Sequence, residues 1–150
     1  MTDTDINALA GRYQDLLGQD ERKVSKPAED DAGNLEITVT TNDLGVLVLL
    51  AKNDAEYVRI VLPNFYALDL DEDKINALVA MNHVNTLCKV AKVNLTEKQD
   101  NVVACVEYLD HGSAVTKPQL DRYLVLLVHT GREFAKKMQA LKGADEALAA

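Results

Sequence analysis

The segment LEITVTTNDLGVLVLLAKNDAEYVRIVL, residues 35–62, decides the fold. Apolar and polar side chains alternate over 35–40, which is the period of a half-buried strand, and Asn42-Asp43 supplies a tight turn. A second strand over 45–52 is apolar on both faces, and a third over 56–62 alternates again. The segment therefore predicts three consecutive antiparallel strands.

The loop between the second and third strands determines which side chains share a face. A two-residue loop at Asn53-Asp54 would put Val58 and Ile60 on the face opposite Ile37, because a one-residue slip flips every side chain. A three-residue loop over 53–55 restores one common apolar face, and we expect that loop. The common face then holds Leu35, Ile37, Val39, Val58, Ile60 and Leu62.

This register leaves a second apolar face, on which Leu47, Leu49, Tyr57 and Val61 lie among polar neighbours. One candidate to cover it is the N-terminal helix or another helix of the same chain, since such sheets are usually closed by helices. The other candidate is a dimer partner or a client protein, because exposed apolar patches commonly mark such sites. These four residues are the predicted protein-interaction site.

The segments on either side of the strands predict helices. Apolar residues at helical spacing predict a helix within 1–18, and the mixed-charge stretch 19–33 predicts a flexible linker. After an expected loop over 63–66, Asp71 is the predicted N-cap of a helix that runs to about Leu87. The apolar positions of this helix include Ile75, Leu78, Val79 and Met81.

The last part of the chain predicts a hairpin and a long helix. Strands over 89–95 and 102–109 are joined by a polar loop, and Thr116 with Gln119 forms a capping box. The apolar seam of the last helix consists of Leu120, Leu124, Leu127, Gly131, Phe134, Met138 and Leu141. We expect the alanine-rich tail, 143–150, to fray.

These elements predict an α+β fold with a mostly antiparallel five-stranded sheet and the order α-β-β-β-α-β-β-α. The length of 150 residues fits one ordinary domain. We place that single domain at 34–142, between the linker and the tail.

The two cysteines raise the question of chemistry. Hairpin pairing puts Cys105 opposite Lys92 and Cys88 opposite Leu109, so the thiols lie on the order of 13 Å apart, too far for a disulfide. A zinc site would need closely spaced cysteine pairs, which the sequence lacks. His83 precedes Cys88 closely enough to serve as its base, but the sequence shows no electropositive setting for a reactive thiol.

Other reactive-looking residues have simpler interpretations. The run 110–113, Asp-His-Gly-Ser, resembles a catalytic triad but is better interpreted as a solvated turn. The acidic run 69–73 resembles the start of an EF-hand, yet Lys74 and Ala80 occupy the Gly and Glu positions. His129 flanks the apolar seam and is expected to be a flanking or partly buried residue. We therefore predict no catalytic, cofactor-binding or metal-binding residues, and no enzymatic activity.

The net charge of −8 would repel phosphate backbones and anionic lipids, so neither nucleic acid nor a membrane is an expected partner. The N-terminus is acidic where a secretory signal would be basic, and the apolar runs are too short to span a bilayer. We expect a cytoplasmic protein.

The later part of the chain resembles a known family. The stretches INALVAMNHVNTLCKVAKVNL, with Asn76, Asn82 and Asn85, then NVVACVEYL, and VTKPQLDRYLVLLVHTGREFAKKMQAL are similar to the YbjN-type bacterial sensory transduction regulators. These share the fold of type III secretion chaperones. The resemblance covers residues 34–142 and rests on element order and spacing. It implies a bacterial, cytoplasmic, non-enzymatic protein that binds other proteins, often as a homodimer, with no catalytic residues to transfer.

The leading hypothesis is therefore a chaperone-like or regulatory protein-binding module whose client is unidentified. The alternative is a small-ligand sensor with a pocket between helix and sheet. An enzyme that uses His83 or Cys88 is the weakest hypothesis.

Overall fold

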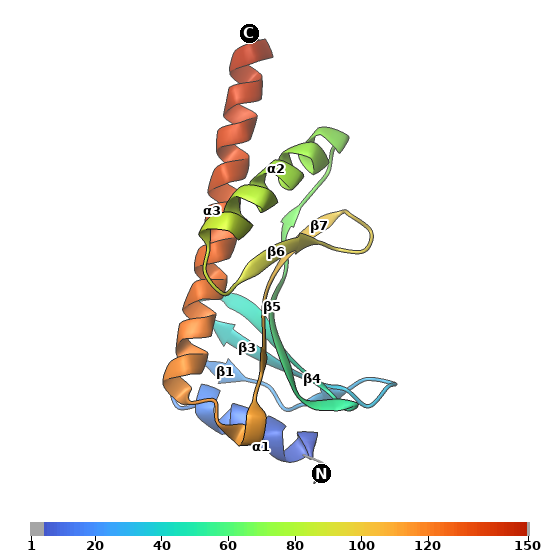
Figure 1. Cartoon of the computed structure of the whole chain (residues 1–150), viewed down its shortest axis with the longest axis vertical. Coiled ribbons are helices and arrows are strands. Elements are labelled where there is room, and N and C mark those ends of the chain that lie inside the picture. Colours follow the sequence, from blue (N-terminus) through green and yellow to red (C-terminus); the bar gives the residue numbers. More distant parts are fainter. Residues whose placement is uncertain (1–4, 150) are drawn as a thin grey trace. The chain divides into compact units, whose positions relative to one another are not determined.

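The computed structural model describes residues 5–149 and has the predicted α+β class (Figure 1). In chain order the elements are α1 (Ile6–Leu17), β1 (Lys23–Val24), β2 (Ala28–Glu29), β3 (Leu35–Thr41), β4 (Leu44–Ala51), β5 (Asp54–Ala67), α2 (Asp71–Leu87), β6 (Lys92–Leu95), β7 (Asn101–Leu109), η1 (His111–Ser113) and α3 (Lys117–Ala149). The sheet has seven strands in the order β1-β3-β4-β5-β7-β6, and β2 also pairs with β3. The strand count and the element order differ in detail from the prediction, because the short strands β1 and β2 precede the five expected ones.

The chain divides into two compact units. Unit 1 holds the residues up to Val61 together with Val106–Leu124, and unit 2 holds Leu62–Cys105 together with the residues from Val125 onward. The helix α1 belongs to unit 1. Three elements, β5, β7 and α3, contribute residues to both units.

In unit 1, β3 and β4 form the predicted hairpin. Asn42 and Asp43 have φ angles of 49° and 64°, the left-handed conformation that a two-residue hairpin turn requires and that Asn and Asp tolerate. Ile37 pairs with Val48 and Val39 with Val46, so the apolar side chains of both strands lie on one face. The predicted turn is confirmed.

The connection between β4 and β5 differs from the predicted loop, although it produces the predicted common apolar face. Leu50 pairs with Val58, but Ala51 pairs with Asp54, so the turn is Lys52-Asn53 and residues 55–57 bulge out of the ladder. The predicted three-residue loop over 53–55 is therefore wrong. The common apolar face is confirmed, because a bulge that adds an odd number of residues restores the same alternation.

The helix α1 covers this common face. It packs against β3 and β4 (Figure 1), and its buried side chains are Ile6, Leu9, Ala10, Tyr13 and Leu17. Asp5 caps the helix, since its carboxylate accepts a hydrogen bond of 2.9 Å from the backbone N–H of Asn7. The strand residues of the common face are buried, whereas those of the other face, except Val61, are at least partly exposed. Of the candidates for covering the second face, α1 is therefore excluded, because it packs on the common face.

The predicted flexible linker over 19–33 contains strands β1 and β2. Both pair antiparallel with β3, β1 near Thr40 and β2 near Glu36. This segment also forms ion pairs with the start of α3. The Lys117 ammonium lies 2.8 Å from the Asp20 carboxylate, and the Arg22 guanidinium lies 2.7 Å from the Asp121 carboxylate. The linker prediction is wrong here because two-residue strands are too short to show an alternating pattern.

In unit 2, α2 covers the predicted range, but its N-cap differs. Leu70, not Asp71, is the N-cap residue. The backbone N–H of Leu70 donates a hydrogen bond of 3.2 Å to the Asp73 carboxylate. Asp73 is also ion-paired with Lys142 at 3.3 Å. The acidic first turn still lies at the positive end of the helix dipole, as the sequence suggests.

Residues 63–66, expected to form a loop, continue β5. Asn64 takes a positive φ of 43° within the strand. The following Phe65 and Tyr66 contact Phe134 of α3 edge to face, with ring centroids 5.7 and 5.4 Å apart. Gly131 permits this close packing, because a Cβ there would lie 3.0 Å from the Leu62 side chain. Packing of aromatic rings thus outweighs the local preference of Pro and Asn for a loop.

The helix α3 matches its prediction at the N-terminus and along its seam. Thr116 donates its backbone N–H to the Gln119 side chain at 3.1 Å, and Gln119 donates its own to the Thr116 hydroxyl at 3.4 Å. The seam residues from Leu120 to Met138 are buried and Leu141 is partly buried. The helix continues to Ala149, whereas the sequence predicted an end near Gly143 and a frayed tail over 143–150.

The hairpin register is confirmed at one cysteine and wrong at the other. Cys105 pairs with Lys92, as predicted. The strand β6 begins only at Lys92, and Cys88 is the C-cap of α2, where its N–H donates to the Val84 carbonyl. Cys88 therefore does not face Leu109.

The outer edge of β6 is occupied by a side chain of α2. The Asn85 amide donates to the Val93 carbonyl at 3.0 Å and accepts from the Val93 N–H at 2.8 Å. This side chain takes the place of a neighbouring strand, which is one way in which proteins protect an exposed sheet edge.

We expect Asn85→Leu to lower the free energy of unfolding by about 2 kcal/mol, because it removes two hydrogen bonds and leaves the Val93 backbone groups unpaired. Urea unfolding followed by circular dichroism measures this loss. The matched control is Asn82→Leu, an exposed position on the same helix. Equal stability of the two variants would contradict a role for Asn85 at the strand edge.

Candidate functional site

The residues considered for catalysis do not form a common site. Cys88 is half-buried and Cys105 is buried, and both are free thiols. His83 and His129 are exposed, and His129 is thus a residue that flanks the seam of α3 rather than a partly buried one. Among the described side chains, 5–112 and 114–144, no group of three or more His, Cys, Asp or Glu could hold a metal ion. The same part of the chain contains no helix long and apolar enough to cross a membrane.

Asp110 is buried, which corrects its interpretation as part of a solvated turn. Its carboxylate accepts hydrogen bonds from the Tyr13 hydroxyl at 2.7 Å and from the Val115 N–H at 3.1 Å. Tyr108 donates to the Tyr13 hydroxyl at 3.0 Å. Burial raises the pKa of both tyrosines, so their hydroxyls stay protonated as donors. These hydrogen bonds link α1 to the segment that precedes α3, so we assign the cluster a role in stabilising the fold.

His111, beside Asp110, is exposed and interacts elsewhere. Its Nδ1 atom lies 2.9 Å from the Glu56 carboxylate. Since Asp110 accepts its hydrogen bonds from Tyr13 and Val115, the residues 110–113 do not have the bonding pattern of a triad.

The predicted interaction site lies on the second face of the sheet in unit 1. Leu47 pairs with Val61 in one cross-strand row, and Leu49 pairs with Arg59 in the next row on the same face. Tyr57 lies in the bulge of β5. Leu47, Leu49 and Tyr57 are half-buried, whereas Val61 is buried with 6% of its surface exposed. The structure therefore brings the four residues together on one face and leaves three of them partly open.

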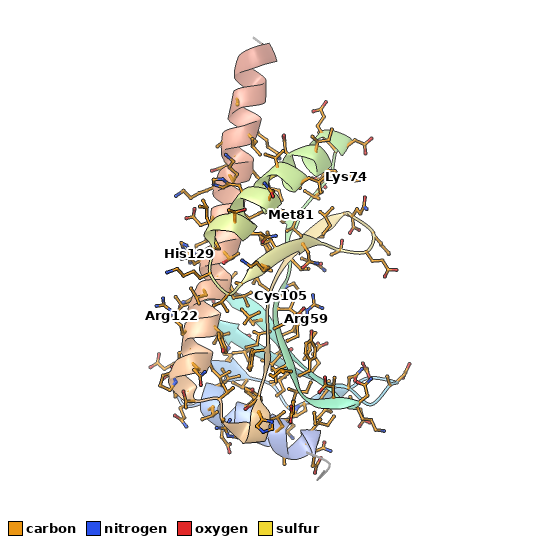
Figure 2. All side chains as sticks on the ribbon, in the orientation of Figure 1. Arg59, Lys74, Met81, Cys105, Arg122 and His129 are labelled. Carbon is orange, nitrogen blue, oxygen red and sulfur yellow. The ribbon has the colours of Figure 1, made fainter. Side chains whose placement is uncertain are left out.

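A hollow of about 420 Å³ lies at one end of this face. Its lining includes Leu49 and Tyr57, and it extends from β2 across β3 and β4 to Arg59 of β5, which is labelled in Figure 2. The hollow lies on the open sheet face, not between helix and sheet, where the ligand-sensor hypothesis placed a pocket.

A second apolar surface, not predicted from the sequence, lies on α2 in unit 2. The exposed fractions are 66% for Ile75, 56% for Leu78 and 48% for Val79. The buried side of the helix consists of smaller or acidic residues: Asp73, Ala77, Ala80 and Val84. The helix thus packs its small residues inward and presents its large aliphatic residues outward, which inverts the usual arrangement.

Beside this surface, a groove of about 350 Å³ runs along α2 and includes Lys137 of α3. Its other lining residues are Val79, Asn82, His83, Thr86 and Leu87. Leu70 and Val90, which flank α2 in the sequence, are also exposed. We call the exposed side chains Ile75, Leu78, Val79 and Leu87 the α2 surface.

The sequence contained a signal for the α2 surface. The sequence analysis named Ile75, Leu78 and Val79 among the apolar positions of this helix. Ala77, Ala80 and Val84 form a competing stripe at helical spacing on the opposite side, and small residues allow close packing. When a helix has two apolar stripes and only one packs against its own unit, the other is available to contact a partner.

Comparisons with known proteins inform the fold. Neither a scan against protein-family models nor a search of curated proteins gives a match. The structure is similar to an uncharacterized protein from Methanothermobacter thermautotrophicus whose crystal structure has been solved, with a TM-score of 0.63 and 10% sequence identity. The similarity covers 90% of this chain and 97% of that one. It shows that the two chains share a fold.

Proposed function

We propose that this chain is a non-enzymatic, protein-binding module, chaperone-like or regulatory, that self-associates through the α2 surface. The supporting observation is the inverted packing of α2, whose large aliphatic residues are about half exposed or more. Each such side chain gains about 1.5–3 kcal/mol when it is fully buried. A helix that leaves several of them outside is best explained by a partner that covers them.

A second copy of the chain fits the charges along α2. The first turn carries Asp71 and Glu72, and His83 lies on the exposed side nearer the C-terminal end, which Lys89 follows. When two copies pair antiparallel about a twofold axis, the acidic first turn of one helix lies opposite Lys89, just beyond the C-terminus of the other. The helix dipoles then also oppose each other favourably.

The sheet face with Leu47, Leu49, Tyr57 and Val61 is the proposed surface for a client protein. It belongs to unit 1, and the α2 surface belongs to unit 2. The resemblance to YbjN-type regulators and to secretion chaperones agrees with a module that pairs with itself and also binds a client.

We expect the wild-type protein to form dimers and the double variant Ile75→Ser/Val79→Ser to raise the dissociation constant about a hundredfold or more. Two copies would lose four apolar side chains at about 1 kcal/mol or more each. Light scattering over a concentration series, with circular dichroism to confirm folding, measures this. The control Val125→Ser changes an aliphatic residue of α3 that is 60% exposed. A monomeric wild type, or an unchanged constant in the double variant, would contradict self-association through α2.

A further inference from the structure

The hollow on the sheet of unit 1 has an apolar floor. Leu49 lies in a cross-strand row between Glu36 of β3 and Arg59 of β5. Tyr57 and Ala51 extend the apolar surface toward the turn between β4 and β5. The Leu49 and Tyr57 side chains are only half-buried, so apolar area remains available to a partner.

The rim of the hollow is acidic. Glu29, Asp30 and Glu36 line it. Hydrogen bonds from the Asn34 side chain and backbone lower the pKa of Asp30, so this carboxylate is charged at neutral pH. Arg59 is the only basic side chain in its described lining, and the Nε atom of Arg59 lies 3.3 Å from the Glu107 carboxylate, which offsets its charge. The Lys52 side chain packs against Gly33 and does not line the hollow.

The dimensions of the hollow suit an extended segment of polypeptide. It crosses four neighbouring strands, β2, β3, β4 and β5. The three spacings between them, at about 4.8 Å each, give a length of about 14 Å. That length matches about four extended residues at about 3.3 Å each. Small-molecule sites enclose most of their ligand, whereas this hollow is open along the sheet face.

We propose that this hollow binds a short apolar segment of a partner protein that is flanked by lysine or arginine residues. The apolar side chains cover Leu49 and Tyr57, and the flanking cations lie against Glu29 and Glu36. The negative net charge of the whole chain adds to the attraction at long range. The hollow lies at one end of the sheet face proposed for a client, so this inference rests on the proposed function and specifies the chemistry of the client. Self-association through the α2 surface does not depend on it and is tested separately.

The test uses the full chain and a fluorescently labelled peptide, Lys-Arg-Leu-Phe-Leu-Arg-Lys, with an acidic twin in which glutamate replaces every cation. Fluorescence anisotropy should show binding of the basic peptide at low salt, at least about tenfold tighter than binding of the acidic twin, and weakened by added salt. Leu49→Ser should weaken binding about fivefold or more. The charge reversal Glu36→Lys, at an exposed position, should reduce the preference for the basic peptide without affecting folding.

The control Glu97→Lys makes the same charge change at an exposed position in the loop between β6 and β7 and should bind like the wild type. The absence of binding by the folded protein would overturn the proposal, as would equal binding of the two peptides. It would also be overturned if Glu36→Lys and Glu97→Lys had the same effect, because the attraction would then come from net charge alone. Binding that Leu49→Ser leaves unchanged would place the peptide elsewhere and would likewise overturn it.

Discussion

Replacing Phe134 by alanine should lower the free energy of unfolding by about 4 kcal/mol. The ring is completely buried in unit 2, where the rings of Phe65 and Tyr66 meet it edge to face. Removal of a buried aromatic ring costs about 3–5 kcal/mol, because apolar contacts are lost and a cavity remains. Urea unfolding monitored by circular dichroism gives the value.

The control for this variant is Val125→Ala, an exposed position on the same helix, where we expect a change within about 0.5 kcal/mol. A loss of less than about 1 kcal/mol in Phe134→Ala would contradict the packing that places Phe65 and Tyr66 in a strand.

Replacing Asp110 by alanine should lower the free energy of unfolding by about 3 kcal/mol. The change leaves the Tyr13 hydroxyl and the Val115 N–H without their buried acceptor, at about 1–3 kcal/mol each. Chemical unfolding of the single variants Asp110→Ala and Tyr13→Phe and of the double variant forms a double-mutant cycle. The cycle should show a coupling energy of about 1–2 kcal/mol.

The control for this cycle is Asp31→Ala, which removes an exposed carboxylate and should change stability within about 0.5 kcal/mol. Strict additivity of Asp110→Ala and Tyr13→Phe would show that the hydrogen bond between them contributes no coupling.

The features that could be predicted from the sequence are those with a local period. The seam of α3 repeats at three- and four-residue spacing, and its residues from Leu120 to Met138 are buried as expected. The pairing of Cys105 with Lys92 follows from the loop that joins β6 and β7. The common face of β3, β4 and β5 was also predictable, although the bulge at residues 55–57 that produces it was not.

The errors have physical causes that act over longer distances. Residues 63–66 contain Pro63 and Asn64, which favour a loop, but Phe65 and Tyr66 are held by Phe134 of a helix much later in the chain. Strands β1 and β2 exist only because β3 pairs with them. The Tyr13 and Asp110 side chains bond across 97 residues of sequence, which no local pattern indicates.

The candidate site was predictable in part. The sequence identified the face with Leu47, Leu49 and Tyr57, because a strand that is apolar on both sides must have two contacts. It did not identify the acidic rim of the hollow, since Glu29 and Asp30 belong to the segment that was interpreted as a linker. It named the apolar residues of α2 but did not show that Ile75, Leu78 and Val79 are exposed, because helix packing depends on the neighbouring elements.

The division of the chain into two interleaved units has a consequence for its synthesis. Unit 1 needs Val106–Leu124, and the segment Leu62–Cys105 of unit 2 is translated before them. A nascent chain therefore cannot complete its N-terminal unit first, as proteins with sequential domains commonly do. The β3–β4 hairpin therefore lacks Val106–Leu124 of its own unit until Leu62–Cys105 of unit 2 have been translated. For the same reason, no continuous fragment of the gene encodes one unit without part of the other.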